Sequence, residues 1–166
     1  MKIYFRPFLC LIFAVLSACG GGNSPTQISS SPRTNGEMVN GVKVPSAPPA
    51  QLNATVIGVD GNSDGVRDDV ERVLAAQFGV EQNSRLIDLA RAYQSFLASP
   101  ASDAASLQRQ LTTILKKEDC INKASSDPTT TSWVRFSVLN TNNRVQAFDD
   151  RVSLIPLEQI AAKCES

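Results

Sequence analysis

The chain has 166 residues, of which 42% are hydrophobic and 19% are charged, a composition typical of a single globular domain. Its 16 basic residues equal its 16 acidic residues, which excludes the strong positive charge that binds nucleic acid or an anionic membrane surface. Histidine is absent, which excludes Ser-His-Asp triads, Cys-His pairs and His-ligated metal centres.

The first 20 residues have the pattern of an export signal. Lys2 and Arg6 form a short positive region, and an uninterrupted apolar run follows over residues 8–16. A helix needs about 20 apolar residues to cross a hydrocarbon core of roughly 30 Å, so this run is too short for a permanent membrane span. The pattern therefore predicts a signal peptide over residues 1–18.

The signal ends in Leu16-Ser17-Ala18-Cys19, which resembles the lipobox of bacterial lipoproteins. In that family the cysteine thiol receives a diacylglycerol, and the signal is cut just before it. The resemblance implies that Cys19 is the lipidated first residue of an exported protein anchored to the bacterial cell envelope. Gly20 follows instead of aspartate, which in the family implies the outer membrane if the host is Gram-negative. The alternative is an ordinary secretory signal with a chance cysteine.

Residues 19–50 are rich in Gly, Ser, Pro, Asn and Thr, and their few apolar residues have no regular spacing. A segment of this composition cannot bury enough apolar surface to offset the entropy lost on folding. We therefore expect a disordered, flexible tether. Globular patterning begins at Gln51, so the folded domain is predicted over residues 51–166.

The spacing of apolar residues in the folded domain predicts an all-α fold, a small bundle of four to five helices. A short β-branched stretch over residues 52–59, extended or a lone strand, precedes the first helix. That helix is expected over residues 66–78, with Gly79 as its C-cap. Further helices are expected over residues 84–99, 102–120, 127–155 (with a break or a polar turn at 140–143) and 156–164.

Two cysteines remain in the predicted domain, Cys120 and Cys164. An exported protein folds in an oxidising compartment, so an even pair of cysteines favours a disulfide. This bond would fasten the C-terminal helix to the end of the third helix. The alternative is two buried thiols, and no C-x-x-C redox motif is present.

Residues 60–71 read DGNSDGVRDDVE and match the pattern D-x-[DN]-x-[DN]-G-x5-E of EF-hand calcium loops. Calcium prefers roughly six to eight oxygen ligands, and alternate side chains on a tightly wound loop point their oxygens at one centre. Gly65 permits the positive φ of the sharp turn. The predicted Ca²⁺ ligands are the side chains of five residues and one backbone carbonyl: Asp60, Asn62, Asp64, Val66 (carbonyl), Asp68 and Glu71. If the acids only capped a helix, the spacing of Asp60, Gly65 and Glu71 would be unexplained.

The resemblance to the EF-hand covers only the loop and the helix after it. Arg67 stands where EF-hands usually place an apolar residue that pairs with a second loop, and the sequence has no second loop. The loop is therefore more similar to the half EF-hand loops of dockerins and thrombospondin-type calcium repeats. The domain also resembles small exported bacterial proteins of unassigned function, which share such a loop (here residues 64–71) and an Asn-Thr-x-x-Arg stretch (here residues 140–144). This second resemblance implies the fold and the calcium site, but no activity.

These features predict a non-enzymatic, lipid-anchored exported protein that binds calcium in a structural role. A second interpretation is a surface-displayed interaction module, such as an adhesin, an inhibitor or an assembly accessory, with an unidentified protein partner. A third is a carboxylate-based hydrolase, although no catalytic residue is indicated. Trp133 and Phe136 are assigned to the core rather than to a ligand groove, and the adjacent Asp149, Asp150 and Arg151 to a solvated face.

Overall fold

The computed structural model describes residues 36–46, 53–156, 160, 163 and 164. All of the described residues belong to one compact unit, Ser31–Ser166. The predicted signal peptide, Cys19 and residues 19–35 of the predicted tether lie outside the described residues. Within the described part, no helix combines the length and the apolar character needed to cross a membrane.

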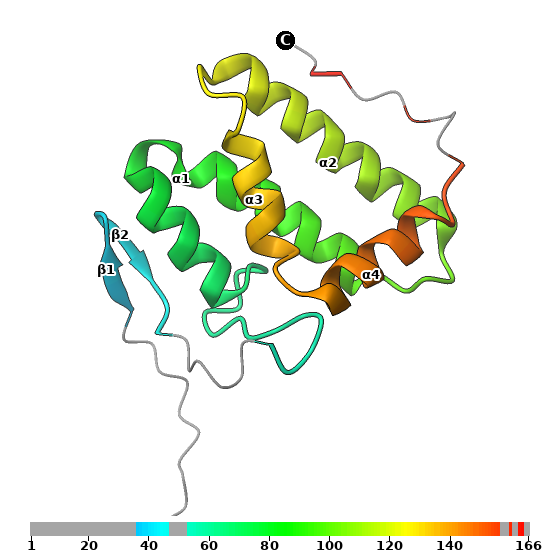
Figure 1. Cartoon of the computed structure of the whole chain (residues 1–166), viewed down its shortest axis with the longest axis horizontal. Coiled ribbons are helices and arrows are strands. Elements are labelled where there is room, and N and C mark those ends of the chain that lie inside the picture. Colours follow the sequence, from blue (N-terminus) through cyan, green and yellow to red (C-terminus); the bar gives the residue numbers. More distant parts are fainter. Residues whose placement is uncertain (1–35, 47–52, 157–159, 161–162, 165–166) are drawn as a thin grey trace, which may run out of the picture. The chain divides into compact units, whose positions relative to one another are not determined.

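The described chain is mostly helical, which confirms the predicted all-α bundle (Figure 1). Its helices are α1 (Asp68–Ala98), α2 (Ala104–Ala124), α3 (Thr130–Val138) and α4 (Asn142–Val152). Helix α1 contacts each of the other three helices, and α2 also contacts α3 and α4. Of the two alternatives at residues 140–143, a break or a polar turn within one helix, the structure has the break: α3 ends at Val138, and α4 begins at Asn142, where the Thr141 side chain caps it.

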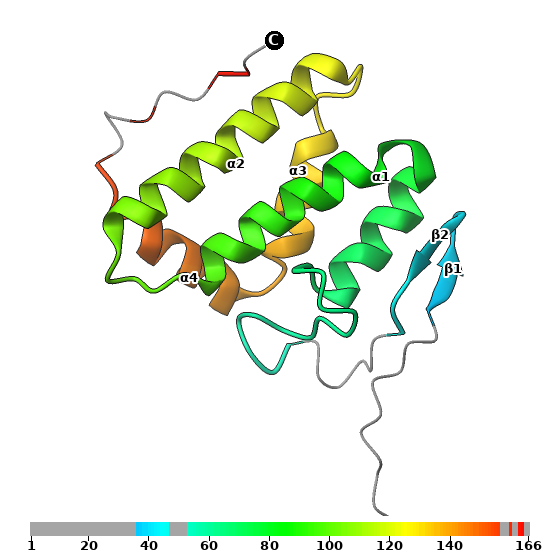
Figure 2. The ribbon, with the colours of Figure 1, turned by 180° about the vertical axis from the view of Figure 1, so that it is seen from behind.

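Helix α1 consists of two arms that meet at a sharp bend at Gly79 (Figure 2). Gly79 has φ 64° and ψ −161°, a conformation open essentially to glycine alone. The sequence therefore placed the end of the first helical stretch correctly, but the second arm resumes at once instead of at Asn83 or Ser84. The first arm begins at Asp68 rather than Val66, because Arg67 is extended and the Asp68 amide donates to the Val59 carbonyl.

A two-stranded antiparallel hairpin, β1 (Glu37–Val39) and β2 (Val42–Val44), corrects the prediction of a disordered tether over these residues. Asn40 and Gly41 form its two-residue turn with φ values of 45° and 81°, the conformation that an Asn-Gly pair adopts readily. An isolated two-stranded hairpin is marginal in water. Composition alone therefore predicted disorder, and contacts with the rest of the domain reverse that outcome.

Those contacts come from the first arm of α1. Val44 is fully buried in them, and Arg72 donates to Glu37 Oε2 at 2.7 Å and to the Pro45 carbonyl at 3.0 Å. A Cβ placed on Gly79 would lie 3.0 Å from the Asn40 amide nitrogen, so the bend of α1 packs directly against the hairpin turn. The hairpin is thus part of the folded domain.

The core gathers buried apolar side chains from all four helices and from the loop before α1. Phe148 of α4 packs against Tyr93 and Phe96 of α1, with ring centroids 5.8 and 5.1 Å apart. Trp133 and Phe136 are not in this core: they are 41% and 73% exposed, so that assignment was wrong. The short α3 turns Val134, Val138 and small polar residues inward, which leaves its aromatic residues on the opposite face.

The predicted disulfide joins Cys120 of α2 to Cys164, with the Cα atoms 4.9 Å apart. The Cys164 amide also donates to Asp119 Oδ2 at 2.7 Å. The bond closes a loop of 44 residues, worth roughly 4 kcal/mol in the chain-entropy model. Much of the helix predicted over residues 156–164 lies outside the described residues, and the described ones there are not helical.

Candidate functional site

The loop of residues 60–71 lies between an extended segment and the first arm of α1, and its base is closed by the Asp68–Val59 backbone hydrogen bond. Its turn is held against the second arm of α1 by Arg91, whose Nε donates to the Asp64 carbonyl at 2.6 Å. Gly65 has φ 89°, a conformation that favours glycine, and a Cβ there would make a tight contact of 3.2 Å with the Arg91 Cγ. The predicted positive φ at Gly65 is confirmed.

In the first half of the loop, side-chain oxygens accept hydrogen bonds from backbone amides and so hold the turn. Asp60 Oδ1 accepts the Asp64 amide at 3.1 Å, and Asp60 Oδ2 accepts the Gly65 amide at 2.8 Å. Asn62 Oδ1 also accepts the Asp64 amide, and Asp64 Oδ1 accepts the Val66 amide at 2.9 Å. The three alternating residues of the predicted ligand set thus all accept hydrogen bonds from the loop backbone, and Val66 is fully buried beside them.

The last two predicted ligands, Asp68 and Glu71, stand on the first turn of α1, and both are buried. Asp68 Oδ1 accepts the Gly61 amide at 2.7 Å. The Asn62 side-chain amide lies 3.3 and 3.4 Å from the two Glu71 oxygens and donates toward them. Both carboxylates therefore point back into the loop.

Burial and the neighbouring carboxylates raise the pKa values of two acidic residues of the loop, Glu71 and Asp68. Burial raises the pKa of Glu71 to about 7; the carboxylates of Asp64, Asp68 and Asp60 add to the rise, while the Asn62 hydrogen bond opposes it. Burial also raises the pKa of Asp68; the carboxylates of Asp60, Asp69 and Asp64 add to the rise, and the hydrogen bond from the Gly61 amide opposes it. A divalent cation at the centre of the loop would relieve this repulsion.

The residue types and their order in the loop fit calcium, but their oxygen atoms do not yet surround one point. No group of three or more Asp, Glu or Cys side chains within the described ranges is already placed to hold a metal ion. Ligation by the full predicted set would require the Asn62 amide to turn its oxygen inward, and Asp68 to release the Gly61 amide. Both changes are side-chain rotations. The Val66 carbonyl, by contrast, can approach an ion only through a movement of the loop backbone.

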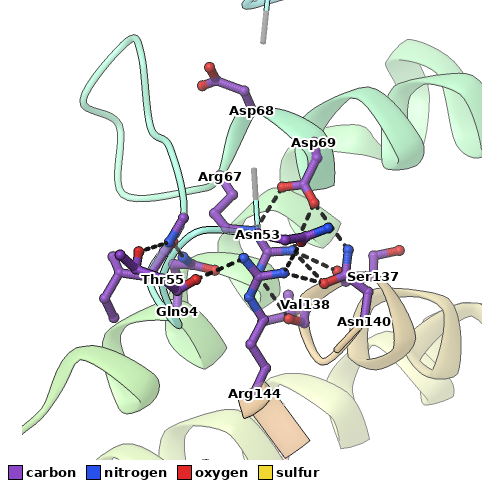
Figure 3. A network of polar contacts seen from close by, with 12 residues as sticks. Asn53, Thr55, Arg67, Asp68, Asp69, Gln94, Ser137, Val138, Asn140 and Arg144 are labelled. Atoms are coloured by element: carbon purple, nitrogen blue, oxygen red, sulfur yellow. Dashed lines mark hydrogen bonds and ion pairs between the residues drawn. The ribbon is translucent and has the colours of Figure 1, made fainter. Parts of the chain in front are cut away.

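Next to the loop is a buried polar cluster that sequence reasoning missed (Figure 3). The fully buried Arg67 donates to both carboxylate oxygens of Asp69, at 2.7 and 3.0 Å. Its Nη1 donates to the Val138 carbonyl at 2.9 Å, and its Nη2 to the Ser137 carbonyl at 3.0 Å and to Asn140 Oδ1 at 3.2 Å. Arg67 thereby caps the C-terminal end of α3.

Arg144, also fully buried, extends the cluster to the segment before the loop (Figure 3). It donates to the Val56 carbonyl at 3.0 Å, the Thr55 carbonyl at 3.2 Å and Asn53 Oδ1 at 2.9 Å. It also donates to Asn140 Oδ1, the atom that Arg67 shares. We call Arg67, Asp69, Asn140 and Arg144 the arginine network.

The single carboxylate of the arginine network is kept ionised by its neighbours. Burial by itself would raise the pKa of Asp69, but the hydrogen bonds and charge of Arg67, together with Asn140 and Arg144, hold that pKa below its usual value. Burial and the charge of Arg67 lower the pKa of Arg144, and Asp69 opposes this. Asp69 is therefore the counter-charge that both buried guanidinium groups require.

The arginine network joins the two stretches on which the resemblance to small exported proteins was based, residues 64–71 and 140–144. In the sequence, Arg67 differs from the EF-hand pattern, which usually has an apolar residue at this position. Its contacts explain the departure: the position that would pair with a second loop instead binds the end of α3. No family model, no curated protein and no solved structure matches the chain, so the chemistry of this site is argued from its residues alone.

Proposed function

We propose that this protein is a calcium-binding, lipid-anchored exported protein, and that the ion has a structural rather than a catalytic role. The observation that carries the proposal is the presence of Asp60, Asp64, Asp68 and Glu71 in one loop, where burial and the charges of the other three carboxylates raise the pKa of Glu71 to about 7. A protein gains nothing from packing four carboxylates this way unless a cation or a proton compensates them.

The proposed ion would neutralise these carboxylates and fix the start of α1, the helix that contacts all the others. A single loop of this kind suits an affinity of extracellular grade, with a dissociation constant of roughly 10⁻⁴–10⁻³ M. At about 1 mM calcium, a dissociation constant of about 0.1 mM would stabilise the domain by about 1.4 kcal/mol.

Calorimetric titration of the full-length chain, purified in a mild detergent, tests the proposal. We expect saturable binding of one calcium ion. Glu71→Gln should weaken binding at least about tenfold, because it removes the bidentate carboxylate. Glu81→Gln is the matched control, since Glu81 is an exposed acid on the other arm of α1 and should leave the affinity unchanged. The absence of saturable binding at millimolar calcium would refute the proposal.

The proposed membrane attachment depends on Cys19 and rests on the lipobox-like sequence before it. Mass spectrometry of the purified protein should show an N-terminal cysteine carrying a diacylglycerol. Cys19→Ser should release the protein from the membrane fraction, and the envelope fraction that retains the native protein identifies its membrane. Retention of residues 1–18 in the mature protein would contradict this part of the proposal.

A second candidate function, a protein-interaction module, is favoured by the exposure of Trp133 and Phe136 on α3. Aromatic residues are enriched at protein–protein interfaces relative to the rest of the surface. Cross-linking in the cell envelope should then capture one partner that is lost in a Trp133→Ser/Phe136→Ser variant and kept in Val145→Ser, a change at an exposed apolar residue of α4.

A further inference from the structure

Arg67 lies directly between two proposed calcium ligands, Val66 and Asp68. Its backbone is extended, and its carbonyl accepts the amides of Val70 and Glu71 at the start of α1. Any movement that brings the Val66 carbonyl and the Asp68 carboxylate onto an ion must therefore move the Arg67 backbone as well.

The Arg67 side chain does not move independently. All of its hydrogen-bonding nitrogens are engaged: Nε and Nη2 hold Asp69, while Nη1 and Nη2 hold the Val138 and Ser137 carbonyls. The group is fully buried, so releasing any of these partners would leave a polar atom without water or protein to replace it. The backbone of Arg67 and the end of α3 are thus connected through one side chain that is fully buried and hydrogen-bonded at every nitrogen.

We infer that Arg67 transmits ion binding from the 60–71 loop to the C-terminal end of α3 and to the turn between α3 and α4. This inference rests on the proposed calcium binding and adds a regulated element to it. An ion that draws the loop together orders the α3–α4 turn, and by thermodynamic reciprocity the turn sets the affinity of the loop.

Asn140 extends the proposed coupling from Arg67 to Arg144, because both arginines donate to the same oxygen. Asn140 Oδ1 accepts from Arg67 and from Arg144, and the Asn140 side-chain amide donates to Asp69 Oδ2 at 3.0 Å. Arg144 in turn holds the carbonyls of Thr55 and Val56, which precede the loop. The segment before the loop and Arg67 within it are therefore both fastened to Asn140 and Arg144, at the α3–α4 turn and the start of α4.

Hydrogen exchange read by mass spectrometry on the full-length chain, with and without calcium, tests the inference. We expect calcium to slow amide exchange in residues 60–71 and, by roughly fivefold or more, in residues 137–145. Trp133, the single tryptophan, supplies a second reading: it lies on α3, and its carbonyl accepts the Ser137 hydroxyl at 2.7 Å. Its fluorescence should change along the same titration curve as the calorimetric heat.

Two variants separate the coupling from binding itself. Arg67→Lys keeps the charge but loses the planar fork, so it should still bind calcium while losing the slowed exchange in residues 137–145. Asn140→Ala lies outside the loop, yet by reciprocity it should weaken calcium binding about fivefold or more. Arg72→Lys and Asn143→Ala are the matched controls, and neither should change the coupling or the affinity.

The outcomes distinguish the two proposals. Saturable calcium binding with slowed exchange confined to residues 60–71 and unchanged Trp133 fluorescence would overturn the coupling and leave the calcium site standing. Absence of binding would overturn both. If Arg67→Lys fails to fold, the wild-type exchange data and the Asn140→Ala affinity decide the matter, and an unchanged affinity in Asn140→Ala counts against the coupling.

Discussion

Arg67 and Asn140 are 73 positions apart in the chain, yet Nη2 of the first donates to Oδ1 of the second at 3.2 Å. This hydrogen bond joins the loop before α1 to the turn between α3 and α4. It belongs to the arginine network, in which one carboxylate compensates two buried guanidinium groups. The domain therefore depends on polar contacts between distant segments as well as on its apolar core.

Asp69→Asn is expected to be strongly destabilising, because it leaves Arg67 buried beside an uncharged partner. We expect a loss of about 2–4 kcal/mol in the free energy of unfolding, measured by urea titration at pH 7. Asp149→Asn, at an exposed residue of α4, should change stability little. The pKa of Asp69 is lowered in the folded state, so its stabilising contribution should be lost as the pH falls toward and below 4, and only in proteins that retain Asp69.

The stability of the protein in chelator should fall as pH rises from 5 to 8. Glu71 has a pKa of about 7 in the folded state against 4.5 for the ordinary group, so in this window the folded state binds a proton that the unfolded state does not. The free energy of unfolding then decreases with pH, by about 1–3 kcal/mol in total. Denaturant titrations at pH 5, 6, 7 and 8 measure the slope.

Glu71→Gln should flatten that slope and make the calcium-free protein more stable than the wild type at pH 8. Calcium should flatten it in the wild type, because the proposed ion replaces the proton. Glu81→Gln should keep the wild-type slope. If the free energy of unfolding of the wild type does not change between pH 5 and pH 8, the pKa of Glu71 is not raised in the folded state.

Gly79→Ala should be destabilising by about 1–3 kcal/mol, since alanine reaches φ 64° and ψ −161° only at a high cost in backbone strain. The added Cβ would also crowd the Asn40 side chain in the hairpin turn. Thermal unfolding measures the loss. Ala76→Gly, on an exposed face of the same helix, should cost about 1 kcal/mol from helix propensity and provides the scale for comparison. If Gly79→Ala does not lower the stability, residue 79 does not have the backbone conformation described for the bend.

Removal of the disulfide by Cys120→Ser/Cys164→Ser should cost about 2–4 kcal/mol, because the unfolded chain regains the freedom of a 44-residue loop. Reduction of the wild type should have the same effect, read as a lower urea midpoint in dithiothreitol. The double variant should itself be insensitive to the reductant. Equal stability with and without the bond would show that other contacts already hold Cys164 in place.

Local patterns in the sequence were sufficient for much of this fold. Apolar residues at helical spacing predicted helices over most of α1 to α4, although the two arms of α1 were expected as separate helices and α3 and α4 as one helix with a break or a polar turn. A proline and a polar run marked the ends of these segments. The glycine at position 79 marked the bend in α1, and the paired cysteines marked the disulfide. Each of these depends on residues close in sequence, or on a pair with no other candidate partner, so the chain itself carried the information.

Other features were decided only by tertiary contacts. The hairpin folds because α1 covers Val44 and binds Glu37, although its composition is that of a tether. Trp133 and Phe136 are exposed because α3 offers its valines to the core. The arginine network requires residues about 70 positions apart to meet, and no local spacing encodes such a meeting. The sequence determined which segments are helical, because helical spacing is local. Burial among distant segments decided which charged side chains became part of the structure.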